Sequence, residues 1–187
     1  KRGGQVSSAM QDLALWGGRI EVAIEPLAAP SLHGMERIEF RVAAHAALEP
    51  GPLSKVASGG ELSRLSLALQ TALMEVAQVP TLIFDEVDAG IGGRVAEIVG
   101  RMLRRLGARH QVMCVTHLPQ VAACAEHHWR VSKAEHDGMV TSRVESLQET
   151  MRVDEIARML GGLKITRATR EHAAEMLREA KRLAAQS

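Results

Sequence analysis

The chain has 187 residues, of which 46% are hydrophobic and 24% charged, and its formal net charge is +1. This length suits one domain or a large fragment of one, and the composition excludes a wholly disordered chain and a strongly basic protein that coats DNA. The longest apolar runs fall far short of the ~18–20 residues of a membrane-spanning helix, so we expect no contact with a membrane. Only Trp16, Phe40, Phe84 and Trp129 are aromatic, which argues against a base-stacking surface for single-stranded nucleic acid.

The two cysteines, Cys114 and Cys124, do not make a disulfide framework, and both lie among apolar residues. We expect reduced thiols that act as small core residues in a cytoplasmic setting. The chain opens with Lys1-Arg2 in a segment of loosely helical apolar spacing that Gly17-Gly18 should end, and no secretory signal is visible. We therefore expect these residues to be cut from a longer chain or to follow a removed segment.

Two alternating patterns follow this first helix. Residues 19–25 and 37–43 alternate polar and apolar side chains, which predicts two strands paired as an antiparallel ribbon. Pro26 and Pro30 should end the first strand. Residues 44–57, which contain a Pro-Gly-Pro sequence, predict a loop.

The middle of the chain alternates predicted helices and strands. One helix begins near Gly60 and another covers about 94–106, while apolar runs at 81–84 and 111–115 are typical of strands buried on both faces of a parallel sheet. This alternation predicts an α/β layer architecture. The residues expected to face inward are Leu62, Leu65, Leu69, Leu73 and Val76 in the first helix, and Val95, Ile98, Val99, Met102 and Leu106 in the second.

The last third of the chain predicts a hairpin between helices. A short helix covers 118–125, and residues 128–133 and 139–144 form two strands around an Asp-Gly turn. Two helices over about 152–160 and 169–184, separated by two glycines, complete the chain.

Two adjacent carboxylates, Asp85 and Glu86, end the first apolar strand. Ligands of open α/β sheets bind beyond the carboxyl ends of the strands, and successive side chains on a strand point in opposite directions. One carboxylate can therefore hold hydrated Mg²⁺ while the other orients or deprotonates a water. Taken alone, the two residues fit a pair of surface acids equally well.

Ser58-Gly59-Gly60-Glu61 stands at the start of the helix near Gly60. Glycines let the backbone approach an anion, a helix N-terminus offers free N–H groups, and the serine can cap the helix or donate to a phosphate. By itself this pattern is more often a capped helix start without a ligand.

His117 follows the second apolar strand. If the two strands are neighbours, His117 lies near Glu86 and can contact a terminal phosphate. A histidine bonded to the backbone at a strand end is the commoner arrangement for a single histidine.

The three patterns together resemble the motifs of an ABC-type ATPase. Residues 55–64, KVASGGELSR, resemble the signature motif, and residues 81–88, TLIFDEVD, resemble a Walker B strand with its catalytic glutamate. Val115-Thr116-His117 resembles the switch-histidine loop.

The details resemble one branch of these ATPases. Val87-Asp88 follows the Asp-Glu pair as in SMC-type proteins, but Gly92 stands where SMC proteins usually have an aspartate. That departure, with the strings FDEVDAGIGG, VTHLPQVAA and ARMLGG, resembles the RecN family of bacterial SMC-like ATPases of DNA double-strand-break repair. The resemblance covers nearly the whole chain from Gly17-Gly18 onward.

The resemblance implies a fold and a division of the chain. It implies the C-terminal half of an ABC/SMC-type P-loop ATPase head, an α/β fold with a buried, largely parallel sheet flanked by helices and a small antiparallel β-ribbon. Residues 1–16 would end a returning coiled-coil helix, and residues 17–187 would form the C-terminal lobe.

The resemblance also implies roles for the motif residues, with ATP and Mg²⁺ as cofactors. Asp85 would hold Mg²⁺ through water, Glu86 would polarise the attacking water, and His117 would contact the γ-phosphate. The remaining nucleotide-binding residues would be Ser58, Gly59, Gly60, Glu61 and Asp88, with the signature residues contacting ATP held by a second head of a homodimer.

A P-loop, GxxxxGK[ST], is absent, because none of the five lysines follows a glycine. We therefore expect ATP hydrolysis only together with an N-terminal Walker A lobe, and no activity from this chain alone. The implied function is to hold or bridge DNA without sequence specificity, in the bacterial cytoplasm at the nucleoid. Another SMC-like or transporter-type head, or a docking module without nucleotide chemistry, are the alternatives.

Other charged groups carry weaker predictions. Arg94, Arg101, Arg104, Arg105 and Arg109 crowd one helix and could neutralise phosphates, but a solvated helix face is the favoured interpretation. The histidines lack the spacing and partners of a zinc site, so we expect none.

Overall fold

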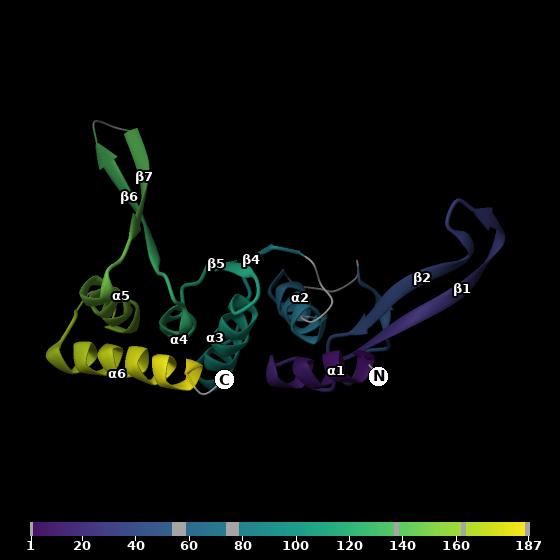
Figure 1. The fold of residues 1–187 in the computed structure, drawn as a ribbon, viewed down its shortest axis with the longest axis horizontal. Coiled ribbons are helices and arrows are strands. Elements are labelled where there is room, and N and C mark those ends of the chain that lie inside the picture. Colours follow the sequence, from purple (N-terminus) through teal and green to yellow (C-terminus); the bar gives the residue numbers. More distant parts are fainter. Residues whose placement is uncertain (1, 54–58, 74–78, 137–138, 162–163, 186–187) are drawn as a thin grey trace. The chain divides into compact units, whose positions relative to one another are not determined.

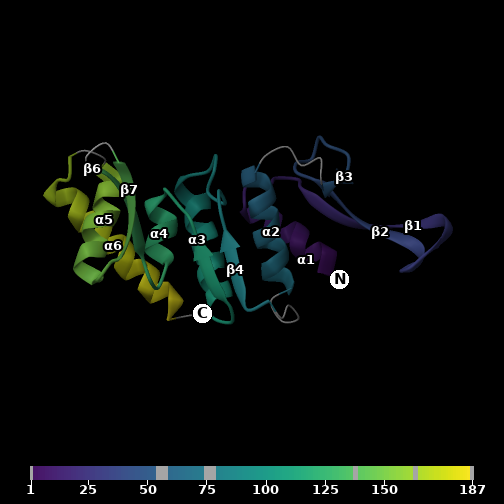
Figure 2. The same ribbon diagram turned by 90° about the horizontal axis from the view of Figure 1, so that it is seen from above.

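The computed structural model describes residues 2–53, 59–73, 79–136, 139–161 and 164–185. The chain forms two compact units, each described by itself. Unit 1 comprises residues 1–91 and 109–115, and unit 2 comprises residues 92–108 and 116–187. Figure 1 labels most elements of both, and Figure 2 adds the label of β3.

The described part of unit 1 combines two helices with two small sheets. The helices are α1 (Arg2–Asp12) and α2 (Gly59–Leu73). One sheet is antiparallel with the strand order β1-β2-β3, and the other is the parallel pair β4-β5. The strands are β1 (Arg19–Ser31), β2 (Gly34–Ala43), β3 (Gly51–Pro52), β4 (Thr81–Phe84) and β5 (Gln111–Cys114).

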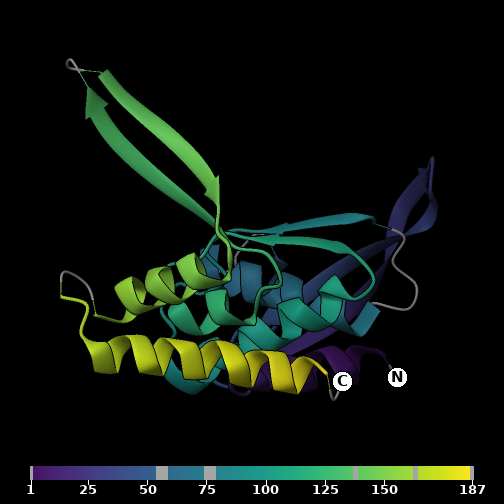
Figure 3. The same ribbon diagram turned by 60° about the vertical axis from the view of Figure 1, so that its left-hand side comes forward.

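β1 and β2 form the predicted antiparallel ribbon, with Arg19 opposite Ala43. The ribbon extends away from α1 and α2 in Figures 1 and 3. The prediction that Pro26 and Pro30 end the first strand is wrong, because β1 runs on to Ser31 after a shift of register. β1 is an edge strand of its sheet. A proline is tolerated there at a position whose backbone N–H would face away from the partner strand, because no ladder hydrogen bond is lost.

The loop predicted over residues 44–57 contains a short strand. Gly51 and Pro52 pair with Val42 and Arg41 to form β3, so the prediction is wrong at these two residues. Two residues of pairing are too few to show as a periodic pattern in the sequence. Residues 54–57 lie outside the described residues.

The first helix is shorter than its predicted end at Gly17-Gly18. α1 stops at Asp12, and the N–H groups of Leu13 and Leu15 both donate to the carbonyl of Met10. Ala14 has a φ of 58°, which closes this tight turn before the glycines are reached.

α2 packs against α1, but not with the face that leucine spacing predicts. Leu65 is buried as expected, whereas Leu62 is 44% exposed and Leu67 is fully buried. Leu69 and Leu73 are half-buried, and Val76 lies outside the described residues. Apolar residues surround most of this helix, so their spacing alone does not select the buried face.

β4 and β5 pair in parallel, from Thr81 opposite Gln111 to Phe84 opposite Cys114, which confirms the parallel strands. The prediction that both faces are buried is wrong. Phe84 is 4% exposed, but Ile83 on the opposite face is 69% exposed. Val115, just past β5, is 64% exposed. The sheet therefore has one covered face and one apolar face that the described residues leave open.

In the described part of unit 2, four helices carry a hairpin. The elements are α3 (Gly93–Gly107), α4 (Pro119–Cys124), β6 (Trp129–His136), β7 (Met139–Ser146), α5 (Glu149–Gly161) and α6 (Arg167–Ala184). The four helices pack side by side in Figure 2, and the β6–β7 hairpin projects from them in Figure 3. All these elements confirm the predicted order, although the last two helices begin two or three residues earlier than expected.

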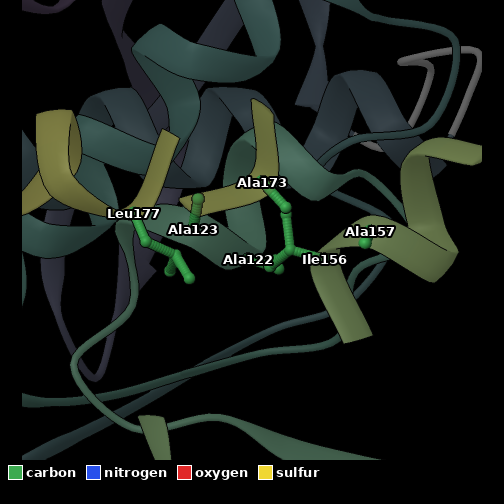
Figure 4. Packing of buried hydrophobic residues seen from close by; sticks show 6 residues of the cluster. All are labelled: Ala122, Ala123, Ile156, Ala157, Ala173 and Leu177. Carbon is green, nitrogen blue, oxygen red and sulfur yellow. The ribbon is translucent and has the colours of Figure 1, made fainter. Parts of the chain in front are cut away.

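The core of unit 2 is built from small and aliphatic side chains. Ile156 and Ala157 of α5 pack against Ala122 and Ala123 of α4 and against Ala173 and Leu177 of α6, as Figure 4 shows. The alanines let three helices approach closely. In α3, Val99 and Leu106 are buried as predicted, but Ala96, Gly100 and Leu103 are buried instead of Val95, Ile98 and Met102, which are half-buried.

Candidate functional site

The loop after β4 presents two carboxylates. Asp85 and Glu86 are exposed, while Val87 and Asp88, the next residues, are 0% and 2% exposed. Glu86 has a φ of 57°, and its N–H donates to Oδ1 of Asp85 at 2.9 Å. A positive φ costs a residue with a side chain about 1–3 kcal/mol and is typical of functional loops. The turn keeps both carboxylates at the carboxyl end of β4.

The start of α2 is bonded to this loop. Oγ of Ser63 donates to the carbonyl of Asp85 at 2.7 Å, and Nη1 of Arg64 donates to the carbonyl of Ala89 at 2.7 Å. The two bonds hold the glycine-rich helix start against the backbone on both sides of Glu86. Unit 1 therefore brings together the two motifs that sequence patterns place 24 to 27 residues apart.

Gly59, the first residue of α2, lies against the side chain of Glu86. A Cβ atom on Gly59 would be 2.6 Å from Oε2 of Glu86, too close for any contact. Glycine thus lets a carboxylate approach the N-terminal end of the helix, where free N–H groups and the helix dipole favour negative charge. The helix start can accept an anion, and in this structure the anionic group next to it is Glu86.

The structure brings several of the predicted site residues together in unit 1. Gly59, Gly60, Glu61, Asp85 and Glu86 all belong to the α2–β4 junction of unit 1. Ser58 lies outside the described residues. Asp88 is 2% exposed, so a contact with a second head would require its loop to move.

His117 belongs to unit 2, two residues after the end of unit 1. The N–H of Val115 donates to the carbonyl of Phe84 at 3.0 Å, so the parallel pairing continues to the end of unit 1. Glu86 lies two residues after Phe84 in the sequence, and His117 lies two residues after Val115. The role of His117 stays a prediction.

Three residues near the carboxylates were given no role at this site from the sequence: Ser63, Arg64 and Cys114. Arg64 is 7% exposed, and burial lowers the pKa of its guanidinium. Burial, followed by the charges of Asp88 and Asp85, raises the pKa of Cys114 to about 12, so its thiol stays protonated beside the carboxylates. An arginine within a leucine-rich helix was the one signal in the sequence that pointed to a buried cation.

The arginine-rich helix α3 has some of its charges committed to neighbours. Arg101 pairs with Glu97, and Arg104 approaches the carbonyl of Cys124 at 3.5 Å and Glu126 at 4.0 Å. Among the described residues, no three His, Cys, Asp or Glu side chains gather as a metal site would need. Nor is any helix within the described ranges long and apolar enough to cross a membrane.

Sequence comparisons place the chain among bacterial repair proteins. It is 47% identical over 175 residues to the DNA repair protein RecN of Xylella fastidiosa (strain Temecula1), covering 92% of this chain and 31% of the relative. It is 46% identical over 170 residues to RecN of Deinococcus radiodurans, covering 91% of this chain and 30% of the relative. The chain is thus similar, over nearly its whole length, to one part of these RecN proteins. It spans about a third of the length of these RecN proteins, and no protein-family model matches it.

Solved structures agree on the fold of this chain. The Smc head domain with coiled coil and joint from Pyrococcus yayanosii has a TM-score of 0.58 at 23% identity, covering 83% of this chain and 28% of that one. A structure from a study of ATP-driven dimerization and DNA-stimulated activation of SMC ATPases has a TM-score of 0.52 at 21% identity, covering 87% and 93%. These likenesses show that the chain has the α/β fold of part of an SMC head.

Proposed function

We propose that this chain is the C-terminal part of an ATPase head in a RecN-type protein of bacterial DNA repair. The observation that carries the proposal is the junction in unit 1, where a glycine-rich helix start is bonded to a loop bearing two exposed carboxylates. The similarity to RecN proteins and the SMC-head fold support the same function. The nucleotide would be held together with an N-terminal Walker A lobe.

The carboxylates of this chain fit a magnesium nucleotide. Asp85 is exposed and offers the oxygen ligands that Mg²⁺ prefers, so it would hold the ion through water. When bound, Mg²⁺ would neutralise charge on the phosphate oxygens. Glu86 lies in a turn at which its own φ is positive. Its carboxylate would accept a hydrogen bond from the attacking water and orient that water.

The glycine-rich start of α2 would complete the site of a second head. Ser58, Gly59 and Gly60, with Glu61 beside them, would meet the γ-phosphate through N–H groups of the helix start. His117 would contact the same phosphate from the other strand end, and Asp88 would line the seam. ATP would then join two heads and hydrolysis would release them, so that the protein holds or bridges DNA without reading its sequence. This cycle would take place in the bacterial cytoplasm, at the nucleoid.

The test is ATP turnover by the whole protein that carries this sequence and by the 187-residue chain alone. We expect turnover only by the whole protein, and Glu86→Gln should reduce it by about 10²–10⁴-fold because it removes the group that orients water. Glu21→Gln, an exposed change on the β1–β2 ribbon, is the matched control. Bound nucleotide without turnover in the whole protein would favour the alternative of a docking module.

A further inference from the structure

Unit 2 contains a cavity that the proposed nucleotide site does not use. It has a volume of about 260 Å³ and opens among residues of α3, α4, α5 and α6. Three of its lining residues are cationic, namely Arg104, Arg152 and Lys181, and one, Glu126, is acidic. Ala123, Leu177 and Ala180 supply its apolar wall. A neighbouring hollow of about 170 Å³ shares Arg152 and Lys181 and adds Arg178 and Glu149.

The positive charge of the cavity is fixed in place by Arg152. This residue is 7% exposed, and its Nη1 and Nη2 donate to the carbonyls of Glu126 at 3.0 Å and Ala125 at 2.7 Å. Its Nε is buried without a partner among the described residues. Burial lowers the pKa of Arg152, the charge of Glu149 raises it, and the charge of Arg104 has a smaller lowering effect. Two guanidinium groups thus lie close enough to repel each other.

The two acids near these cations, Glu126 and Glu149, have largely exposed side chains. Glu126 is 71% exposed on its side chain and lies 4.0 Å from Arg104. Glu149 pairs with Lys181 where both side chains are more than half exposed. Both acids can therefore turn to solvent when another anion enters. Surface pairs of this kind hold together only weakly.

Capping of α4 explains part of this arrangement. Arg152 and Arg104 reach carbonyls at the C-terminal end of α4, where cations are favoured. Capping does not explain why Lys181, from the far end of α6, lines the same cavity.

We propose that this cavity binds a phosphate group, with Arg104 and Lys181 contacting its oxygens and Arg152 supplying fixed positive charge beneath them. The cavity is smaller than the ~300–1,000 Å³ of sites for larger ligands, which suits a single phosphate with the apolar part of an ester against Leu177. Guanidinium and ammonium groups are the usual partners of phosphate oxygens. The ligand can be free phosphate, a phosphate monoester or a backbone phosphate of DNA.

The 187-residue chain is titrated with inorganic phosphate by calorimetry, and chloride at equal ionic strength is the reference. We expect phosphate to bind, and Arg104→Gln or Lys181→Gln to weaken it about 10- to 100-fold, as the loss of one charged hydrogen bond does. Both residues are partly exposed, so the variants should fold, which circular dichroism checks. Arg104→Lys keeps the charge and should retain most of the affinity.

Matched controls sit beside each tested residue. Arg101 lies one turn before Arg104 and pairs with Glu97, and Arg101→Gln is the control for Arg104. Arg182 follows Lys181 and pairs with Glu179, and Arg182→Gln is the control for Lys181. Neither Arg101 nor Arg182 lines the cavity. Failure of phosphate to bind more than chloride, or equal weakening by these controls, would overturn the proposal. This readout does not involve ATP turnover, so its outcome is independent of the ATPase test.

A competition arm separates the sources of the phosphate. A short single-stranded oligonucleotide, with and without a terminal phosphate, is added to the phosphate-bound protein. Displacement by both supports a backbone phosphate, and displacement only by the phosphorylated form supports a monoester. Absence of displacement by either supports the free anion.

Discussion

Arg64 of α2 and Ala89 of the loop after β4 are joined by a hydrogen bond of 2.7 Å from Nη1 to the carbonyl oxygen. The arginine is 7% exposed, and its Nε is buried without a partner among the described residues. Burial lowers the pKa of Arg64, whereas the charge of Glu61 raises it. Burying a cation in this way costs free energy. The bond from Arg64 is therefore better explained as holding the loop after β4 in position than as stabilising the fold.

Arg64→Met tests this explanation. Loss of the bond to Ala89 costs about 1–3 kcal/mol, but removal of a buried, incompletely bonded cation offsets much of it. We expect the free energy of unfolding, from urea titration, to change by less than about 1 kcal/mol. ATP turnover of the whole protein should fall at least about tenfold, because the loop that carries Glu86 loses its tether. Arg37→Met, an exposed change on the ribbon, is the control, and strong destabilisation with unchanged turnover would show a structural clamp only.

Gly59→Ala separates activity from stability. The new Cβ would lie 2.6 Å from Oε2 of Glu86, at the flexible end of that side chain, so the carboxylate has to move. Because Gly59 is the first residue of α2, alanine there gains less than the ~0.5–1 kcal/mol that it gains in the middle of a helix. We expect equal or slightly higher stability with turnover by the whole protein reduced several-fold.

Gly60→Ala is the matched comparison in the same helix turn. Its Cβ would lie 3.0 Å from Cβ of Ala89 and 3.2 Å from the carbonyl oxygen of that residue, so backbone has to yield. Stability should therefore fall by about 1 kcal/mol in urea titration. If Gly59→Ala left turnover by the whole protein unchanged, the close approach of Glu86 to the helix start would not exist in solution.

Sequence patterns located the strands and helices better than they located burial. Strand alternation predicted the pairing of β1 with β2, and the apolar runs predicted the parallel pair β4-β5. The buried face of α2 could not be predicted, because apolar residues surround that helix and α1 packs against only part of it. Ile83 is exposed because this chain covers one face of its sheet, which local pattern cannot reveal.

The candidate site was partly predictable for a related reason. Asp85, Glu86 and Gly59 belong to short motifs whose residue types indicate the chemistry of the site. The bonds from Ser63 and Arg64 to the loop depend on a tertiary contact between segments more than twenty residues apart. Such contacts follow from packing, which no spacing rule along the chain contains.

Gly100→Ala probes the packing of unit 2. Gly100 lies in α3, and an added Cβ would be 2.8 Å from Sγ and 3.0 Å from Cβ of Cys124 in α4. Overpacking of this kind costs about 1–3 kcal/mol. Gly107→Ala in the same helix meets nothing within 4 Å and should stay within about 0.5 kcal/mol of the unchanged protein. Thermal unfolding of both variants gives the comparison, and equal melting temperatures would contradict the contact of α3 with α4.

The stability of unit 2 should depend on pH through His128, at the base of the β6–β7 hairpin. Burial lowers the pKa of His128, the charge of Arg152 lowers it further, and Glu155 opposes both. Nδ1 of His128 is buried without a partner among the described residues. The folded protein therefore resists a proton that the unfolded chain accepts near pH 6.5. Stability is full above that pH and is lost as the pH falls toward the lowered folded pKa.

Urea midpoints at pH 7.5, 6.5 and 5.5 measure this loss, which cannot exceed about 1.4 kcal/mol per pH unit for one histidine. Glu155 does not interfere in this range, because hydrogen bonding from Arg158 lowers the pKa of its carboxyl and its contribution is lost only at more acidic pH. His128→Asn should flatten the dependence, whereas His127→Asn, at the exposed neighbouring position, should retain it. A slope that persists in His128→Asn would assign the proton uptake to another group.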